Sequence, residues 1–272
     1  MLSFMKMTLE EQVQHAVAGD KNALEKVIGE VQGKVYNLAL RMLWSPEEAQ
    51  DATQEILIKL ITHLSRFEHR SAFTTWVYRL ATNELLNYRK KHSRPQLAFD
   101  VFQDQLSEGL VEGISTSSYL VEEKLLLQEA KVGCSLAMLQ CLDADGRAAY
   151  LIGEVLGFQG PEAAYILEVT PEVFRKRLSR SRQRVQSFVR QQCGLVNPEN
   201  PCRCKRQIAP NVKRGIIQPH QLLFAAESES AQMIAWVDGV ADEVALFQST
   251  PEYTAPEDLL QQVKEWIQAP QS

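Results

Sequence analysis

The sequence predicts an all-α fold with two helical domains, an acidic linker between them and a small helical C-terminal extension. Three observations support this prediction. Apolar residues recur at helical spacing through most of the 272 residues. Serine, threonine or aspartate stands where these stretches begin, and glycine or proline stands where they end. The expected boundaries are 1–95 for the first domain, 96–122 for the linker, 123–191 for the second domain and 192–272 for the extension.

The first helices are marked by their caps. Thr8 and Glu11 form a capping box that opens a short helix, and Gly19 ends it. Asp20 is the expected N-cap of the next helix, in which apolar residues keep helical spacing as far as Trp44. The first domain therefore begins with two helices.

A third helix is predicted from Pro46 to about Leu64. Ser45 is its expected N-cap, proline occupies the first helical position, and a glutamate stands three residues after the cap. Its first half is polar and its second half is apolar. From the sequence pattern alone, the acidic residues are explained by the favourable interaction of carboxylates with a helix N-terminus.

The stretch from Ser71 to Arg94 is predicted to be a helix with aromatic, amide and cationic side chains on one stripe, and Pro95 ends it. Single-stranded nucleic acid requires these groups: ring faces for stacking, amides for base edges and cations for phosphates. The alternative is a helix whose aromatic residues belong to the core and whose basic end is merely solvated. The stripe and the basic end contain Trp76, Arg79, Asn83, Asn87, Arg89, Lys90 and Lys91.

The charge is unevenly distributed along the chain. The formal net charge is −5, yet residues 98–123 contain no lysine or arginine, whereas residues 171–214 are strongly basic. Residues 222–272 are acidic again. Because local charge steers binding, the sequence predicts basic surfaces separated by acidic stretches. The linker at 96–122 also contains glycines and a serine-rich run, and we expect it to have little fixed structure.

The second domain shows a helix-turn-helix pattern. A support helix is predicted at 147–156, a short helix at 161–167, a turn at 168–169 and a longer helix from Pro171 to about Gln191. Phe174, Leu178, Val185 and Phe188 form the expected buried stripe of the last helix. Its other face is cationic from the first turn, as a recognition helix in the major groove would require.

Two segments resemble conserved regions of one family, the bacterial RNA polymerase sigma factors of the extracytoplasmic-function type. Residues 67–94, with SAFTTWVYRLATNELLNYRKKHSR, resemble the second conserved region, and GFQGPEAAYILEVTPEVFRKRLSRSRQRVQSF resembles the fourth. The resemblance implies a non-enzymatic specificity subunit that binds core RNA polymerase and promoter DNA and directs promoter recognition, DNA melting and transcription initiation. An anti-sigma factor stays open as a further partner.

The resemblance also assigns roles to residues. The DATQE motif implies contacts to core polymerase from Asp51, Gln54 and Glu55. The minus-ten promoter element would be bound by Phe67, Trp76, Arg79, Asn83, Asn87, Arg89, Lys90 and Lys91, and the minus-thirty-five element by Thr170, Arg175, Lys176, Ser179 and Arg180. The first turn of the last helix departs from the family pattern at Pro171, Glu172 and Phe174, so the DNA sequence that it reads does not follow.

The C-terminal extension is not explained by the resemblance. Three cysteines and a histidine, Cys193, Cys202, Cys204 and His220, are candidate ligands for a thiophilic metal, although their spacing is not that of most structural zinc sites. Reduced thiols are the other interpretation, and then no cofactor is expected. Cys134 and Cys141 are expected to pack as small hydrophobes. The acidic end of the extension is expected to lie on the basic second domain.

Composition and motifs limit the remaining possibilities. No apolar run reaches the length of a membrane span, and the N-terminus lacks the pattern of a signal peptide, so we expect a cytoplasmic protein without membrane insertion. Catalytic motifs are absent, and the five histidines are scattered. Two alternatives stay open: a helix-turn-helix regulator that acts without polymerase, and a thiol-based metal or redox sensor.

Overall fold

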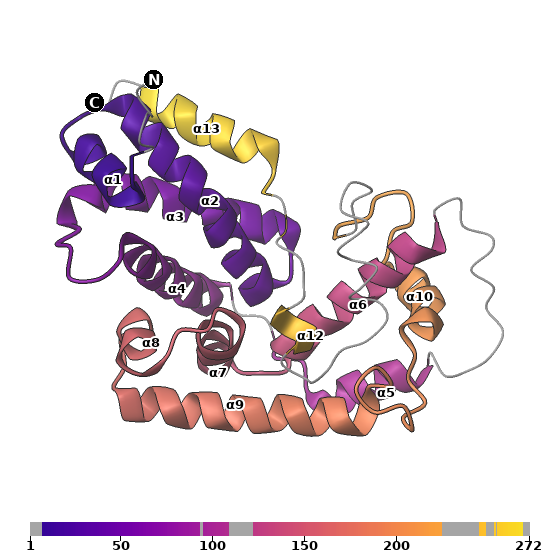
Figure 1. Ribbon diagram of the computed structural model, residues 1–272. Coiled ribbons are helices and arrows are strands. Elements are labelled where there is room, and N and C mark those ends of the chain that lie inside the picture. The colour runs from indigo at the N-terminus through magenta and orange to yellow at the C-terminus, as the bar shows by residue number, and fades with distance from the viewer. Residues whose placement is uncertain are drawn as a thin grey trace, which may run out of the picture. The chain divides into compact units, whose positions relative to one another are not determined.

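The computed structural model describes residues 7–92, 95–108, 122–224, 245–248, 253 and 255–268 (Figure 1). Throughout these residues the regular structure is helical, apart from one isolated β-bridge, which confirms the predicted all-α class. The chain divides into two compact units. The first unit comprises residues 1–93, 161–170 and 252–272, and the second comprises residues 94–160 and 171–251.

The first unit is built on four helices whose starts follow the predicted caps. These are α1 (Leu9–Val17), α2 (Lys21–Leu43), α3 (Pro46–His63) and α4 (Phe73–Lys91), with the short 3-10 turn η1 (Leu64–Arg66) after α3. The capping box is present, because the Thr8 hydroxyl accepts from the Glu11 amide at 3.2 Å and the Glu11 carboxylate accepts from the Thr8 amide at 2.8 Å. Ser45 caps α3 by accepting from the Glu48 amide.

The core of the first unit lies where α2, α3 and α4 meet. Val31, Leu57 and Phe73 are each fully buried there, at 0% exposure. Trp44 ends α2 in the left-handed conformation, with φ of 57°, and reverses the chain into α3. This three-helix core places one face of α4 toward the apolar interior and leaves the adjacent polar stripe at the surface.

The end of the chain returns to the first unit. Helix α13 (Glu257–Gln268) packs against α2 and α3 and lies beside α2 in Figure 1. Leu259 and Val263 are both 0% exposed, and Asn37 exchanges two hydrogen bonds with the Tyr253 backbone at 2.7 and 2.8 Å. The expectation that this acidic segment lies on the second domain is therefore wrong for residues 253–268, because the apolar face of α13 is buried against α2 and α3.

The second unit contains α5 (Phe99–Glu108), α6 (Glu123–Gln140), α7 (Ala144–Tyr150), a π-helical turn at Leu151–Val155, α9 (Pro171–Gln192), α10 (Cys204–Lys213) and α12 (Ala245–Gln248). Residues 192–224 and 245–248 thus belong to this unit, whereas α13 belongs to the first. The predicted extension is divided between the two units. Helices α6 and α10 pack side by side around Leu126 and Ile208.

Helix α5 corrects the prediction of an irregular linker. Its Phe102 and Leu106 are 6% and 9% exposed, and the Phe102 ring stacks on Phe188 of α9 with centroids 5.5 Å apart. The Gln207 amide and the Arg214 guanidinium donate to backbone carbonyls near the C-terminus of α5. The prediction of little fixed structure is therefore wrong for residues 99–108, where buried aromatic contacts offset the acidic composition.

Two glycines allow α7 and the following π-helical turn to approach α9 closely. A Cβ atom on Gly146 would lie 2.7 Å from the Ser181 hydroxyl, and one on Gly153 would lie 2.9 Å from the Leu178 side chain. The Ser181 hydroxyl also donates to the Gly146 carbonyl at 3.0 Å. The two glycines that make the support helix look irregular in the sequence thus allow a close contact with α9, and this contact holds α9 in place.

Arg147 of α7 caps the C-terminal end of α6. Its side chain is 0% exposed, and its guanidinium donates to the carbonyls of Leu139, Gln140 and Leu142 at 2.8, 3.4 and 3.1 Å. The last carbonyls of a helix have no partner within the helix, so a buried cation at this position satisfies both hydrogen bonding and the helix dipole. Arg147 therefore fixes the angle between α6 and α7.

Candidate nucleic-acid interface

A surface pocket of about 430 Å³ opens in the first unit beside α4. It gathers residues from the end of α3, the following loop, α4 and the segment around α8 (Gly160–Ile166). Four residues that the sequence predicted to bind DNA line it together: Phe67, Trp76, Arg79 and Asn83. The remaining wall comes from His63, Arg66, Glu68, Arg70, Ser71, Leu80, Glu84, Tyr165 and Glu168.

Aromatic rings form one wall of the pocket. The Phe67 ring lies 5.3 Å from Phe73 in an edge-to-face arrangement and 5.6 Å from Trp76, measured between centroids. Phe67 is only 7% exposed and Phe73 is 0% exposed, whereas Trp76 is half-buried. The half-buried indole thus packs against two more deeply buried rings, which suits a stacking platform for a base. Phe67 acts mainly as that support.

Arg79 and Asn83 supply polar groups from successive turns of α4. The Arg79 guanidinium lies 4.3 Å from the Tyr165 ring centroid and donates to the Glu168 carboxylate at 2.7 and 2.9 Å. Burial lowers the pKa of Arg79, but the hydrogen bonds to Glu168 and Tyr165 raise it, and the net shift is upward. Arg79 therefore stays cationic, and its charge is paired with the half-exposed carboxylate of Glu168.

The segment that holds Arg79 also reaches a second position on α4. The Thr75 hydroxyl donates to the Glu162 carboxylate at 2.7 Å. Glu168 adopts a left-handed backbone conformation, with φ of 52°, directly after α8. Two acidic residues thus occupy the face of α4 on which the sequence predicted contacts with nucleic acid.

We expect the substitution Glu168→Gln to raise the affinity of the first unit for single-stranded DNA by about three- to tenfold, because the loss of a half-exposed ion pair of about 1 kcal/mol frees Arg79 for phosphate. Fluorescence anisotropy with a labelled single-stranded oligonucleotide measures this affinity. Glu122→Gln is the matched control, because it removes the same charge from an exposed ion pair with Lys124, outside the pocket and away from the predicted DNA-binding residues. Equal effects of both substitutions would show that only net charge matters.

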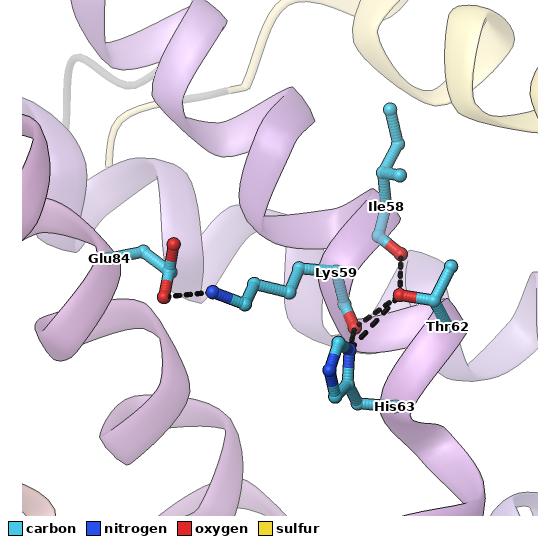
Figure 2. A network of polar contacts seen from close by, with 5 residues as sticks. All are labelled: Ile58, Lys59, Thr62, His63 and Glu84. Carbon is cyan, nitrogen blue, oxygen red and sulfur yellow. Dashed lines mark hydrogen bonds and ion pairs between the residues drawn. The ribbon is translucent and has the colours of Figure 1, made fainter.

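A polar network connects α3 and α4 beside the pocket (Figure 2). The Lys59 ammonium of α3 pairs with Glu84 of α4 at 2.5 Å, and the Lys59 carbonyl accepts from the Thr62 hydroxyl and contacts the His63 ring nitrogen Nδ1 at 2.9 Å. Glu84 and His63 both line the pocket. This cross-helix pair couples the predicted polymerase-docking helix to the predicted DNA-binding helix, and no spacing in the sequence pointed to it.

The other predicted minus-ten residues lie beyond the pocket toward the C-terminal end of α4. Asn87, Lys90 and Lys91 are exposed, and Arg89 is half-buried. They occupy the last turns of α4, where cations also interact favourably with the helix dipole. The predicted stripe therefore has two parts, a pocket and a basic end.

The predicted docking residues lie on the outer side of α3. Asp51 and Glu55 are exposed and Gln54 is half-buried, while Ala52 and Thr53 between them face the core at 2% and 0% exposure. The polar first half of α3 is thus available to a partner. Its apolar second half contributes to the core of the unit.

Helix α9 presents the predicted basic face. Arg175, Lys176, Ser179 and Arg180 are all exposed, as is Thr170 directly before the helix. Phe174, Val185 and Phe188 are buried, which confirms the predicted inner stripe, and Leu178 is half-buried. A cationic face of this length in an exposed helix is suited to the major groove of duplex DNA.

Comparison with known proteins shows which family this chain is similar to. Residues 27–95 match the model for sigma-70 region 2. Over 133 residues the chain is 29% identical to the ECF RNA polymerase sigma factor SigW of Bacillus subtilis, which covers 49% of this chain and 68% of that protein. It is 28% identical over 184 residues to the ECF RNA polymerase sigma-E factor of Escherichia coli, covering 68% and 95% of the two chains. The chain is thus similar to extracytoplasmic-function sigma factors in and beyond its sigma-70 region 2.

A further relative is the RNA polymerase sigma-H factor of Pseudomonas aeruginosa, 27% identical over 176 residues that cover 65% of this chain and 91% of that one. These matches support the family resemblance and the expected function of an alternative sigma factor in transcription initiation. They favour neither the regulator that acts without polymerase nor the metal or redox sensor as the main activity.

The structure brings three of the four candidate metal ligands together. Cys193, Cys202 and Cys204 line one small cavity together with Cys134, and the exposed His220 is not among its lining residues. Within the described residues, no three cysteine, histidine, aspartate or glutamate side chains are arranged to hold one metal ion. Cys141 is fully buried and donates to the Ala137 carbonyl, as a small core residue would. Burial raises its pKa to about 12.

Membrane insertion was not expected from the sequence. In the described part of the chain, no helix combines the length and the apolar character needed to cross a membrane.

Proposed function

We propose that this sigma factor opens promoters by capturing single-stranded DNA in the pocket beside α4. The supporting observation is that Phe67, Trp76, Arg79 and Asn83 converge on one pocket whose size suits a single nucleobase. The Trp76 ring would stack on a base, the Asn83 amide would bind its edge, and Arg79 would bind the adjacent phosphate once released from Glu168. Asn87 and the basic end formed by Arg89, Lys90 and Lys91 would follow the strand along α4.

The other two surfaces complete the proposal. Asp51, Gln54 and Glu55 on the outer side of α3 would bind core RNA polymerase. The exposed residues of α9, together with Thr170, would bind the minus-thirty-five element in the major groove, with Arg175, Lys176 and Arg180 on phosphates or base edges and Ser179 between them. The protein would act in the cytoplasm as a non-enzymatic subunit without a resident cofactor. An anti-sigma factor would compete for the same faces.

Transcription from a promoter library tests this function. Purified core RNA polymerase is assayed with and without the protein, and the start sites are sequenced. The proposal expects new start sites that share two spaced sequence elements. Binding to duplex DNA without any polymerase-dependent start site would instead support an ordinary helix-turn-helix regulator.

We expect the double substitution Lys176→Ala and Arg180→Ala to weaken binding to the minus-thirty-five duplex and to reduce the dependence of log Kd on log salt by about 2, because each cation on a phosphate contributes about 1 to that slope. Titrations of the polymerase holoenzyme at several salt concentrations measure the slope. Lys205→Ala is the matched control, because Lys205 belongs to α10 and pairs with Glu123 at the surface. An unchanged slope would remove these residues from the DNA contact.

A further inference from the structure

Four of the five cysteines meet in one cavity of the second unit. Cys134 comes from α6, Cys193 follows the end of α9, and Cys202 and Cys204 stand at the start of α10. All four are free thiols, and each is partly buried. None of the residues that line this cavity is among those proposed above to bind DNA or polymerase.

Two of the four cysteines face each other across paired backbone. Cys193 and Cys202 form an isolated parallel β-bridge. Chains paired in this way lie about 4.8 Å apart, and the Cα atoms of disulfides are usually separated by about 4.4–6.8 Å. Because both side chains also line the same cavity, they are placed on the same side of the bridge. The backbone geometry therefore already satisfies the main requirement of a disulfide.

Gly194 makes this close approach possible. A Cβ atom at this position would lie 2.3 Å from the Cys202 carbonyl oxygen. The loop between the two cysteines is held from several sides, because the Asn200 amide donates to the Arg190 and Cys193 carbonyls at 2.9 and 3.2 Å. The Arg203 guanidinium donates to the Pro198 carbonyl at 2.9 Å. Bond formation between the thiols would therefore require little further ordering of the chain.

We propose that Cys193 and Cys202 form a reversible disulfide when the sigma factor is exposed to a hydroperoxide. One thiolate attacks a peroxide oxygen, which gives a sulfenic acid and releases water after proton transfer. The other thiolate attacks the sulfenic sulfur, the S–S bond forms, and a second water leaves. Two thiols and one hydrogen peroxide thus give one disulfide and two waters.

The surroundings favour this pair over the other thiols. Burial raises the pKa of Cys134 strongly and that of Cys204 to about 12, which keeps both protonated. Burial and Cys193 raise the pKa of Cys202 on balance, although a hydrogen bond from Gln207 at 3.8 Å and the charges of Arg203 and Arg206 partly offset this rise. The Gln207 side-chain oxygen is buried without a hydrogen-bond partner, so the cavity retains an acceptor for a thiol proton.

Peptide mapping tests the proposal. The full-length protein is purified under reducing conditions, treated with hydrogen peroxide, alkylated and digested with trypsin. Residues 191–203 form a single tryptic peptide that contains both Cys193 and Cys202, whereas Cys204 falls in the next peptide. We expect the 191–203 peptide to change from doubly alkylated to unalkylated and two hydrogens lighter, and to return to the alkylated form after dithiothreitol.

Three variants separate the possible outcomes. Cys193→Ser should abolish the lighter peptide, whereas Cys204→Ser should leave it unchanged. Gly194→Ala should lower its yield at least severalfold, because the added methyl group would push the paired segments apart. A link from Cys202 or Cys193 to the 204–205 peptide would overturn the assignment. So would stoichiometric zinc in the purified protein with no disulfide after peroxide, since it would indicate a metal site. Neither result depends on whether the promoter-opening proposal is correct.

Discussion

The double substitution Trp76→Ala and Asn83→Ala is expected to abolish promoter opening while core polymerase binding is retained. Removing a stacking ring costs about 1–3 kcal/mol per base, and removing an amide that reads a base edge costs a further 1–3 kcal/mol or so. Together these losses correspond to a decrease of about thirtyfold or more in open complexes. Permanganate footprinting of the melted region measures opening, and co-elution with core polymerase measures binding.

The structure supplies a matched control for this experiment. Trp76 is half-buried and packs against Phe67 and Phe73, so its loss could disturb the fold as well as the DNA contact. Trp76→Phe keeps a ring at the same position and should retain most of the opening activity. If Trp76→Ala/Asn83→Ala opened promoters normally, the pocket would not be the site of strand capture, and the basic end of α4 would have to bind the strand alone.

Arg147→Met is expected to destabilise the second unit by about 2–4 kcal/mol. Methionine fills a similar volume, but the buried carbonyls of Leu139, Gln140 and Leu142 lose their charged donor. Leaving buried polar groups without a partner costs about 1–3 kcal/mol each, partly relieved by relaxation. Urea unfolding followed by circular dichroism measures the loss, and affinity for the minus-thirty-five duplex should fall with it because α7 supports α9.

Arg177→Met is the control for this substitution. Arg177 forms a partly exposed ion pair with Asp145 between α9 and α7, and such pairs contribute about 0–1 kcal/mol. If Arg147→Met reduced the stability as little as Arg177→Met does, water would have to replace the guanidinium at the end of α6.

Local signals made much of the fold predictable from the sequence. The Thr8 capping box, the Ser45 cap and the proline at the start of α9 each act within one helical turn, so the chain itself contains the interacting partners. The same holds for the alternation of buried and exposed faces along α4 and α9. Trp76, Arg79 and Asn83 were predicted as a group because they lie about one helical turn apart, whereas Phe67 was predicted from the family resemblance.

The missed features depend on partners far apart in the chain. The α5 helix is stabilised by Phe188, some ninety residues away in sequence, and Arg79 by Glu168 at a similar separation. Cys134 joins the other three thiols only because α6 and α10 pack together. The prediction from charge was also wrong for the acidic helix α13. This helix packs on α2 and α3 through its apolar face, because burial of Leu259 and Val263 contributes more than attraction to a basic surface.

The return of α13 to the first unit bears on the order in which the protein is made and folded. Because α1 to α4 leave the ribosome long before residues 257–268, the apolar surface of α2 and α3 that Leu259 and Val263 cover stays open during synthesis of the second unit. A nascent chain would therefore complete its first unit only after the second unit has been synthesised. Chains that stop before residue 257 would leave this apolar surface uncovered.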